Sequence, residues 1–176
     1  GAPVAPSVYF YTDEYAEFWS EDRSILADNG GPIAIDAAPV TGAVQLDLGT
    51  GIGAIGGKAV VIAAGTIVET VVTGSAADSI LGGGARLRAD TGDGDDFIIS
   101  EGIDKRIKGE DGDDTIVGGA GSDVLYGGQG RDVFVFLAAT DGVDKIGDFK
   151  SSKDKIAFDS DDFSVLGKVV DAAEFV

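Results

Sequence analysis

The feature that most restricts the fold of this chain is a nine-residue repeat. Between Thr73 and Val135 the sequence divides, without insertion, into TGSAADSIL, GGGARLRAD, TGDGDDFII, SEGIDKRIK, GEDGDDTIV, GGAGSDVLY and GGQGRDVFV. Position six is Asp in five of the seven units, and position eight is apolar in all of them. A fixed short period predicts a stack of similar units, each burying its apolar side against its neighbours. The residues at position eight are Ile80, Ala89, Ile98, Ile107, Ile116, Leu125 and Phe134.

Each unit is expected to form a six-residue loop followed by a three-residue strand. One inward apolar side chain per strand suits a narrow core, and glycines in the loop permit positive φ, which turns carbonyl oxygens inward. Calcium takes six to eight hard oxygen ligands, and carbonyls with a carboxylate supply them. The alternative interpretation is a set of solvated turns in an ordinary β protein, but solvated turns have no reason to keep a nine-residue register.

The units sort into two edges if two of them make one full coil. Loops 18 residues apart then stack, and the units starting at 73, 91, 109 and 127 form an edge that keeps every position-six Asp. This odd edge predicts three calcium sites, between successive loops 73–78, 91–96, 109–114 and 127–132. The even edge has Leu87 and Lys105 at position six and keeps only Asp123.

One further even-edge site is expected where loop 118–123 meets an acid of the tail, with Asp141, Asp144 and Asp148 as candidates. The whole array is expected to bind about three to five calcium ions. The predicted metal-binding residues are Asp78, Thr91, Gly92, Asp93, Gly94, Asp96, Gly109, Asp111, Gly112, Asp114, Gly118, Gly121, Asp123, Gly127, Gly128, Gly130, Asp132 and Asp148.

Basic residues gather on the even edge, and they have two interpretations. Fixed cations can replace missing calcium and offset nearby Asp charge, which is the interpretation we prefer. Alternatively, they form a patch for a small anion or an acidic polysaccharide. The residues are Arg86, Arg88, Lys105, Arg106 and Lys108.

Composition excludes several chemistries. The chain has no His and no Cys, which removes zinc-protease motifs, Ser-His-Asp triads, thiol catalysis and disulfides from this segment. Its formal charge of −18, with 24 Asp and 7 Glu, argues against nucleic acid as a partner and favours cations. No apolar run approaches about 20 residues, so membrane insertion is not expected. We expect no catalytic activity from this segment.

The chain divides into four regions that differ in composition and hydrophobic pattern. Residues 1–24 are predicted to be a linker and a short helical or irregular lead-in, with a weak helical pattern over 12–19, and no signal peptide is visible. Residues 25–72 are predicted to form N-terminal strands that pack onto the repeat array of 73–135. Residues 136–176 return to aromatic and aliphatic side chains and are predicted to cap the open end of the stack.

The units fit the pattern G-G-x-G-x-D-x-U-x, and the chain resembles the RTX family of secreted bacterial proteins. The flanks add to the likeness: residues 57–70, 130–136, 144–149 and 154–156 resemble the entry to and exit from the repeats in the C-terminal domain of serralysin-type metalloproteases. The resemblance covers roughly residues 25–176. It implies an all-β fold: a parallel β-roll, which is a two-sheet right-handed β-solenoid of nonapeptide repeats, with N-terminal strands and a C-terminal β-rich cap.

The same resemblance implies a calcium-binding module of a protein secreted by a Gram-negative bacterium through a type I secretion apparatus. The module would fold on extracellular calcium and support an attached upstream domain, such as a zinc metalloprotease. Such domains usually continue beyond a segment like 170–176 into a C-terminal export signal, so we expect the cap to be truncated here. The second hypothesis is a carbohydrate-binding or adhesion module on the same scaffold, suggested by the even-edge cations and by N-terminal aromatic residues. Those residues are Tyr9, Tyr11, Tyr15, Phe18 and Trp19.

Overall fold

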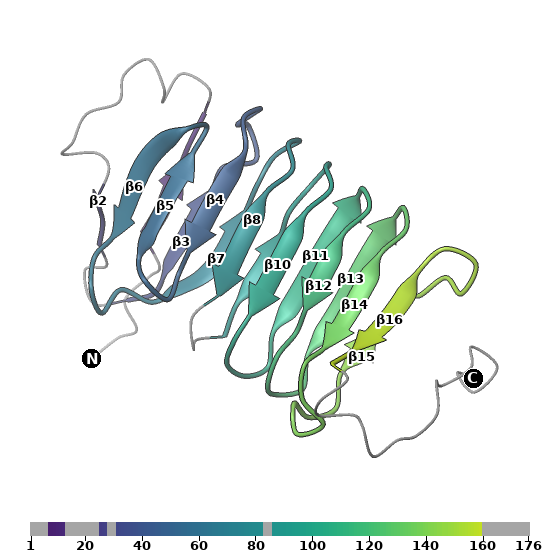
Figure 1. Ribbon diagram of the computed structural model, residues 1–176. Coiled ribbons are helices and arrows are strands. Elements are labelled where there is room, and N and C mark those ends of the chain that lie inside the picture. Colours follow the sequence, from purple (N-terminus) through teal and green to yellow (C-terminus); the bar gives the residue numbers. More distant parts are fainter. Residues whose placement is uncertain (1–6, 13–24, 28–30, 83–85, 160–176) are drawn as a thin grey trace.

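The molecule is a stack of short β-strands wound into two sheets (Figure 1). A computed structural model describes residues 7–12, 25–27, 31–82 and 86–159, and this part of the chain contains strands but no helix. The first sheet holds, in spatial order, β1 (Ser7–Phe10), β3 (Ile33–Asp36), β7 (Val68–Val72), β9 (Arg88–Asp90), β11 (Arg106–Asp111), β13 (Val124–Gln129) and β15 (Lys145–Ile146). The second holds β16 (Lys155–Phe158), β14 (Val133–Phe136), β12 (Thr115–Val117), β10 (Phe97–Ser100), β8 (Ser79–Gly82), β4 (Val44–Asp47), β5 (Ile52–Ile55), β6 (Lys58–Ile62) and β2 (Ile25–Leu26).

From β7 to β16 successive strands alternate between the sheets, and strands within a sheet pair in parallel one coil apart. Ile98 lies opposite Ile80 and Ile116 in the second sheet, so the partners are 18 residues away on either side. Ile107 has the same relation to Ala89 and Leu125 in the first sheet. Two nine-residue units therefore make one coil, which confirms the predicted β-roll and its register.

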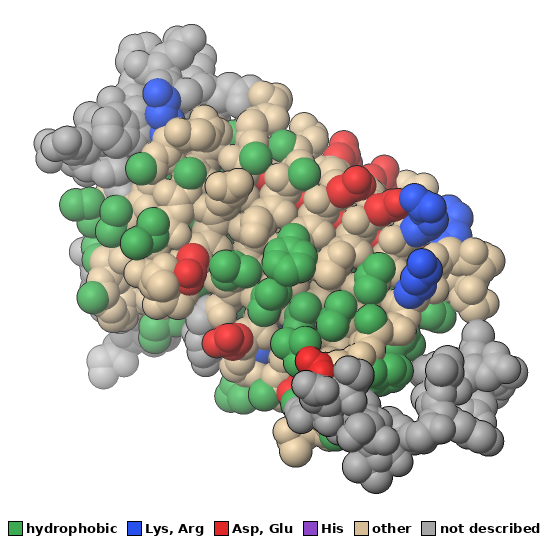
Figure 2. All heavy atoms as spheres, in the orientation of Figure 1, with side chains coloured by type: hydrophobic (Ala, Val, Ile, Leu, Met, Phe, Trp, Pro, Cys, Tyr) green, Lys and Arg blue, Asp and Glu red, His purple; other side chains and the backbone are tan. Residues whose placement is uncertain are grey.

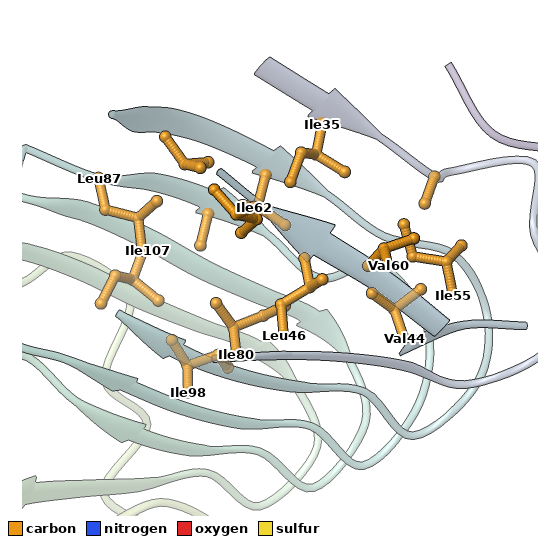
Figure 3. Close-up of a cluster of buried hydrophobic side chains, with 14 of the residues drawn as sticks. Ile35, Val44, Leu46, Ile55, Val60, Ile62, Ile80, Leu87, Ile98 and Ile107 are labelled. Carbon is orange, nitrogen blue, oxygen red and sulfur yellow. The ribbon is translucent and has the colours of Figure 1, made fainter. Parts of the chain in front are cut away.

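The core lies between the two sheets, and within the repeats each sheet contributes one row of inward apolar side chains. Every residue predicted to point inward at position eight is at most 3% exposed. The alternation of buried and exposed residues along each strand follows from the two-residue period of β-structure, and it leaves position eight as the inward side chain of each three-residue strand. Figure 3 shows the row of the second sheet continuing from Ile98 and Ile80 to Leu46, with Val44 of the N-terminal part beyond.

The N-terminal strands extend the two sheets of the roll. β7 pairs in parallel with β9, β3 pairs with β7, and β4 pairs with β8. Between β4 and β7 the chain inserts an antiparallel excursion, β4–β5–β6. Most of the predicted helical segment lies outside the described residues, and no described helix is long and apolar enough to cross a membrane.

The tail adds one more coil as far as the structure describes it. β15 pairs with β13 and β16 pairs with β14. The Phe134 ring, fully buried, lies 6.2 Å from the Phe149 ring, while Phe136 stacks on Phe158 with ring centres 5.6 Å apart. Phe136, Ile146 and Phe149 pack against the buried core at this end of the stack, where a solenoid needs a cap.

Candidate calcium sites

The position-six carboxylates of the odd edge form a ladder between coils. The backbone N–H of Asp78 donates to Oδ1 of Asp96 over 2.7 Å, and that of Asp96 donates to Oδ1 of Asp114 over 2.9 Å. The Asp114 N–H completes the series by donating to Asp132 over 3.2 Å. Each Asp thus reaches back to the loop one coil earlier, so each carboxylate belongs to one loop–loop interface.

The second oxygen of every one of these carboxylates has no hydrogen-bond donor. A buried acceptor without a partner is costly, so native structures rarely keep one unless an ion or water satisfies it. The buried and unpartnered atoms are Oδ2 of Asp78, Asp96, Asp114, Asp123 and Asp132. All of these atoms belong to position six of their units, and the four on the odd edge indicate cation sites between the stacked loops.

Burial also changes the proton affinity of these groups. Desolvation, with smaller contributions from neighbouring Asp charges, raises the pKa of Asp96 and of Asp114 to about 7. Desolvation likewise raises the pKa of Asp78, Asp123 and Asp132. A carboxylate in such a place favours either a proton or a metal ion, and a divalent cation would keep it ionised at neutral pH.

In loops 109–114 and 127–132, glycine at positions one and four shapes the space around the position-six carboxylate. Gly112, at position four, has φ of 150°, and an added Cβ would collide with the Gly94 carbonyl oxygen of the neighbouring coil. At position one, a Cβ on Gly109 or Gly127 would collide with the unpartnered oxygen of its own loop's Asp. Without a Cβ at position one, the carboxylate oxygen of Asp114 lies near a main-chain carbonyl of the next coil, and hard oxygens of this kind are the ligands that calcium takes.

The side chains of Asp93 and Asp111 do not enter these spaces. Both are exposed, and Asp111 accepts a hydrogen bond from the Gln129 side chain over 2.8 Å. Of these position-three residues, only the main-chain carbonyl oxygens are available as ligands for an ion between the loops. Consistently, no three Asp, Glu, His or Cys side chains cluster as a metal site within the described residues.

Residues 106–135 match the family model for the RTX calcium-binding nonapeptide repeat, in four copies. The chain carries RTX calcium-binding repeats. No curated protein matches the sequence. The match covers the best-formed RTX units, and the ladder shows that equivalent geometry continues toward the N-terminus, through Asp96 to Asp78.

The even edge of the RTX array contains a built-in cation. Lys105 is only 2% exposed, and its Nζ donates to the carbonyls of Gly102 (2.9 Å), Gly118 (2.8 Å) and Ala120 (3.4 Å). Its backbone N–H donates to Oδ1 of Asp123 over 2.8 Å, as in the odd-edge ladder. Burial lowers the pKa of Lys105, and the nearby carboxylates, Asp123 first, oppose that shift. The ammonium thus makes the contacts expected of a cation that replaces calcium, and Lys105 is too buried to contact a polysaccharide.

Of the three tail acids expected as candidates for loop 118–123, Asp144 lies at that loop and Asp148 does not. Asp144 accepts the N–H of Asp123 over 2.9 Å and is the acid that meets loop 118–123. Asp148 lies on the odd edge instead, where it accepts the N–H groups of Gly127 and Gly128. The predicted pairing of Asp148 with loop 118–123 is therefore wrong, because a residue four positions later has already passed to the other edge of the coil.

Sequence reasoning missed Asp154. It is 7% exposed, and its Oδ1 accepts the Asp132 N–H over 3.3 Å, which continues the odd-edge ladder into the tail. Its other oxygen accepts the Lys150 N–H, and the Lys150 ammonium contacts the Gly128 carbonyl. The only signal was an Asp 22 residues after Asp132, which falls outside the nine-residue register.

The other four basic residues lie on the outer face of the first sheet. Lys108 pairs with Asp90 and Glu110, and Arg86 lies 3.5 Å from Asp104. Arg106 lies over the Tyr126 ring at 5.0 Å and is the strand partner of Arg88. No ion pair of Arg88 occurs with the described residues, so the guanidinium groups of this pair carry no carboxylate partner there.

Proposed function

We propose that this chain is a non-catalytic calcium-binding module of a type I secreted bacterial protein, which folds when it meets extracellular calcium. The single observation that carries the proposal is the row of four buried odd-edge carboxylate oxygens without donors, those of Asp78, Asp96, Asp114 and Asp132. Without a counter-ion their charges repel one another across the stacked loops. A bound calcium ion gives the buried oxygens a partner and also neutralises the repulsion between the carboxylates. Calcium binding and folding are therefore coupled.

The charge of the chain suits such a coupling. At −18 the calcium-free chain repels itself and favours open conformations, which can pass through a narrow export channel. Extracellular calcium modules have affinities of about 10⁻⁴–10⁻³ M, weak enough to stay empty inside a cell and to fill outside it. Folding at the exit would then make export directional and would stabilise a domain attached upstream. In this proposal the role corresponds to that of the C-terminal domain of serralysin-type proteases.

A calcium titration tests the proposal. Circular dichroism in chelator should show little β-structure, and calcium should induce a cooperative gain in β signal that magnesium does not produce. Magnesium is smaller and demands octahedral geometry, which stacked loop carbonyls do not offer. A spectrum unchanged across the calcium titration would contradict the proposal.

A second candidate function is binding of an acidic polysaccharide by the outer face of the first sheet. A hollow of about 350 Å³ is lined there by Arg86, Arg88 and Arg106, with Thr70, Glu69 and Asp104 beside them. Like charges directly opposite each other on neighbouring strands are destabilising, so the adjacent Arg88 and Arg106 favour an anionic ligand between them. Guanidinium groups bind carboxylates in a bidentate manner, as acidic sugars would require.

Two arginine substitutions distinguish the two functions. Arg88→Ala and Arg106→Ala should leave calcium-induced folding unchanged and should each abolish retention on an acidic polysaccharide such as alginate. Lys108→Ala is the matched control, because Lys108 is already paired with Asp90 and Glu110. Equal retention of the wild type on a neutral polysaccharide would contradict this second function.

A further inference from the structure

A segment outside the repeats occupies the position of a repeat unit. β4 pairs with β8 so that Leu46 lies opposite Ile80, and both are buried in the core. Counted back from Leu46 as position eight, residues 39–47 read PVTGAVQLD, with Gly42 at position four and Val44 at position six. The excursion through β5 and β6 separates this unit from Thr73, which is why the sequence period does not reveal it.

Loop 39–44 stacks on loop 73–78 as the repeat loops stack on one another. An added Cβ on Gly74 would collide with the Val40 carbonyl oxygen, just as a Cβ on Gly92 would collide with that of Gly74. The Val44 N–H donates to Oδ1 of Asp78 over 2.7 Å, which is the ladder bond at position six. Asp78 therefore reaches back to the non-repeat loop, and not forward to loop 91–96.

Oδ1 of Asp78 accepts the Val44 N–H, and hydrogen bonding by the Thr73 hydroxyl and the Gly74 N–H lowers the pKa of Asp78 against the larger rise caused by desolvation. The residue is 4% exposed, and its Oδ2 is buried without a donor. The facing residue at position six is Val44, which is apolar and fully buried, so it cannot neutralise the charge. An ionised carboxylate cannot be kept there at neutral pH at low cost without a cation.

Lys105 shows where a cation lies in such an interface. Its backbone N–H donates to Asp123 as that of Val44 donates to Asp78. Its ammonium contacts the carbonyls at positions one and three of the loop that carries Asp123, which are those of Gly118 and Ala120. The corresponding carbonyls of loop 73–78 belong to Thr73 and Ser75.

We infer that loops 39–44 and 73–78 form a calcium site in which Asp78 and the carbonyls of Thr73 and Ser75 bind the ion, facing the non-repeat loop. This site lies outside residues 106–135, which the RTX family model covers. The inference rests on the proposed calcium-dependent folding and extends it. A calcium ion at this site stabilises the pairing of β4 with β8. Because β5 and β6 continue the sheet from β4, it also stabilises the antiparallel β4–β5–β6 excursion. Calcium would thus order the chain beyond the N-terminal end of the repeats.

The test compares Asp78→Asn with wild type by two measurements at saturating calcium. Native mass spectrometry or calorimetry should give one calcium ion fewer for the variant. Hydrogen exchange should show that calcium no longer protects residues 39–47, while residues 109–132 keep their calcium-dependent protection. Asp47→Asn is the matched control, since it removes the same charge from the facing unit 39–47 and its amide oxygen can still accept from Gly49 and Thr50. It should retain every ion.

A second variant tests the site by replacing the ion. Val44 and Lys105 occupy the same position six, each facing the Asp of the next coil. In Val44→Lys the new ammonium should therefore occupy the place of the calcium ion beside Asp78. This variant should bind one ion fewer, yet its residues 39–47 should stay protected and should lose their dependence on that ion. The combination of a lost ion with retained protection distinguishes occupation of the site from simple damage.

The outcomes separate this inference from the proposed function. If Asp78→Asn keeps the wild-type ion count and the calcium-dependent protection of 39–47, the inferred site is wrong while calcium-dependent folding stands. If wild type binds no calcium and residues 109–132 gain no protection from it, the proposed function itself fails. If Asp78→Asn does not fold, Val44→Lys decides: an unchanged ion count in that variant overturns the site.

Discussion

At the scale of single residues, backbone conformation decides which side chains the loops tolerate. Position two of the regular loops adopts positive φ, with 83° at Gly92 and 103° at Gly128, but Glu110 occupies the same position with φ of 78°. A left-handed conformation costs a residue with a Cβ about 1–2 kcal/mol relative to glycine. Glu110 gains back part of this through its contact with Lys108, at 2.6 Å.

We predict that Glu110→Gly stabilises the calcium-loaded roll by about 1 kcal/mol, because a partly exposed ion pair contributes less than the strain it offsets. Denaturant unfolding at saturating calcium measures the change. Gly128→Ala at the same position should act in the opposite direction, since its Cβ would collide with the Glu110 carbonyl oxygen. A loss of stability in Glu110→Gly would show that the Lys108 contact dominates.

Lys105 yields a second prediction at this scale. Lys105→Ala removes a buried cation and leaves Asp123 without its counter-charge, which should destabilise the roll by about 3 kcal/mol. The calcium stoichiometry should not fall, because the lysine site holds no ion in the wild type. Thermal melts combined with calorimetry test both parts. A calcium ion bound between loops 100–105 and 118–123 of the wild-type protein would refute this assignment.

At the scale of elements, calcium is expected to bind between stacked loops and not between strands. Loop 109–114 stacks on loops 91–96 and 127–132, so it takes part in two interfaces. Asp114→Ala should therefore remove at least one ion and shift the calcium midpoint of folding upward several-fold. Asp104→Asn should be nearly silent, within about 0.5 kcal/mol, because the Asp104 side chain is exposed, its ion pair with Arg86 lies on the surface, and Asn tolerates the φ of 50° at this position. Calcium titrations followed by circular dichroism compare the two, and equal effects would contradict the two-edge arrangement.

At the scale of the whole molecule, protons and calcium should act as alternative partners of the same carboxylates. The pKa of Asp96 and of Asp114 rises from 3.8 to about 7 in the folded, calcium-free chain. Between about pH 4 and 7 the folded state therefore holds protons that the unfolded state has released, and stability falls as pH rises through this window. In chelator, acidification from pH 7.5 to 4 should increase β-structure, as circular dichroism can measure.

With calcium present the pH dependence should reverse. Protons then compete with the ion for the carboxylates, so the calcium midpoint should rise as pH falls below about 7. Calcium titrations at pH 7.5, 6.5 and 5.5 test this, and Asp114→Asn should weaken the dependence because one titrating group is gone. A calcium midpoint independent of pH would argue that carbonyls alone hold the ions.

The sequence by itself determined the coil, its two edges and most of the candidate ligands, because an uninterrupted period of nine fixes which residues face inward. Position-eight burial, the odd-edge ladder and the cation at Lys105 all follow from local pattern and chemistry. The tertiary structure alone decided what happens where the period breaks. The excursion through β5 and β6 hides the unit at 39–47, and the irregular spacing of the tail sends Asp144 and Asp148 to opposite edges. At both ends of the repeat array, the partner of a residue depends on how many residues the chain uses before it returns to the stack. The nine-residue period carries no information about that number.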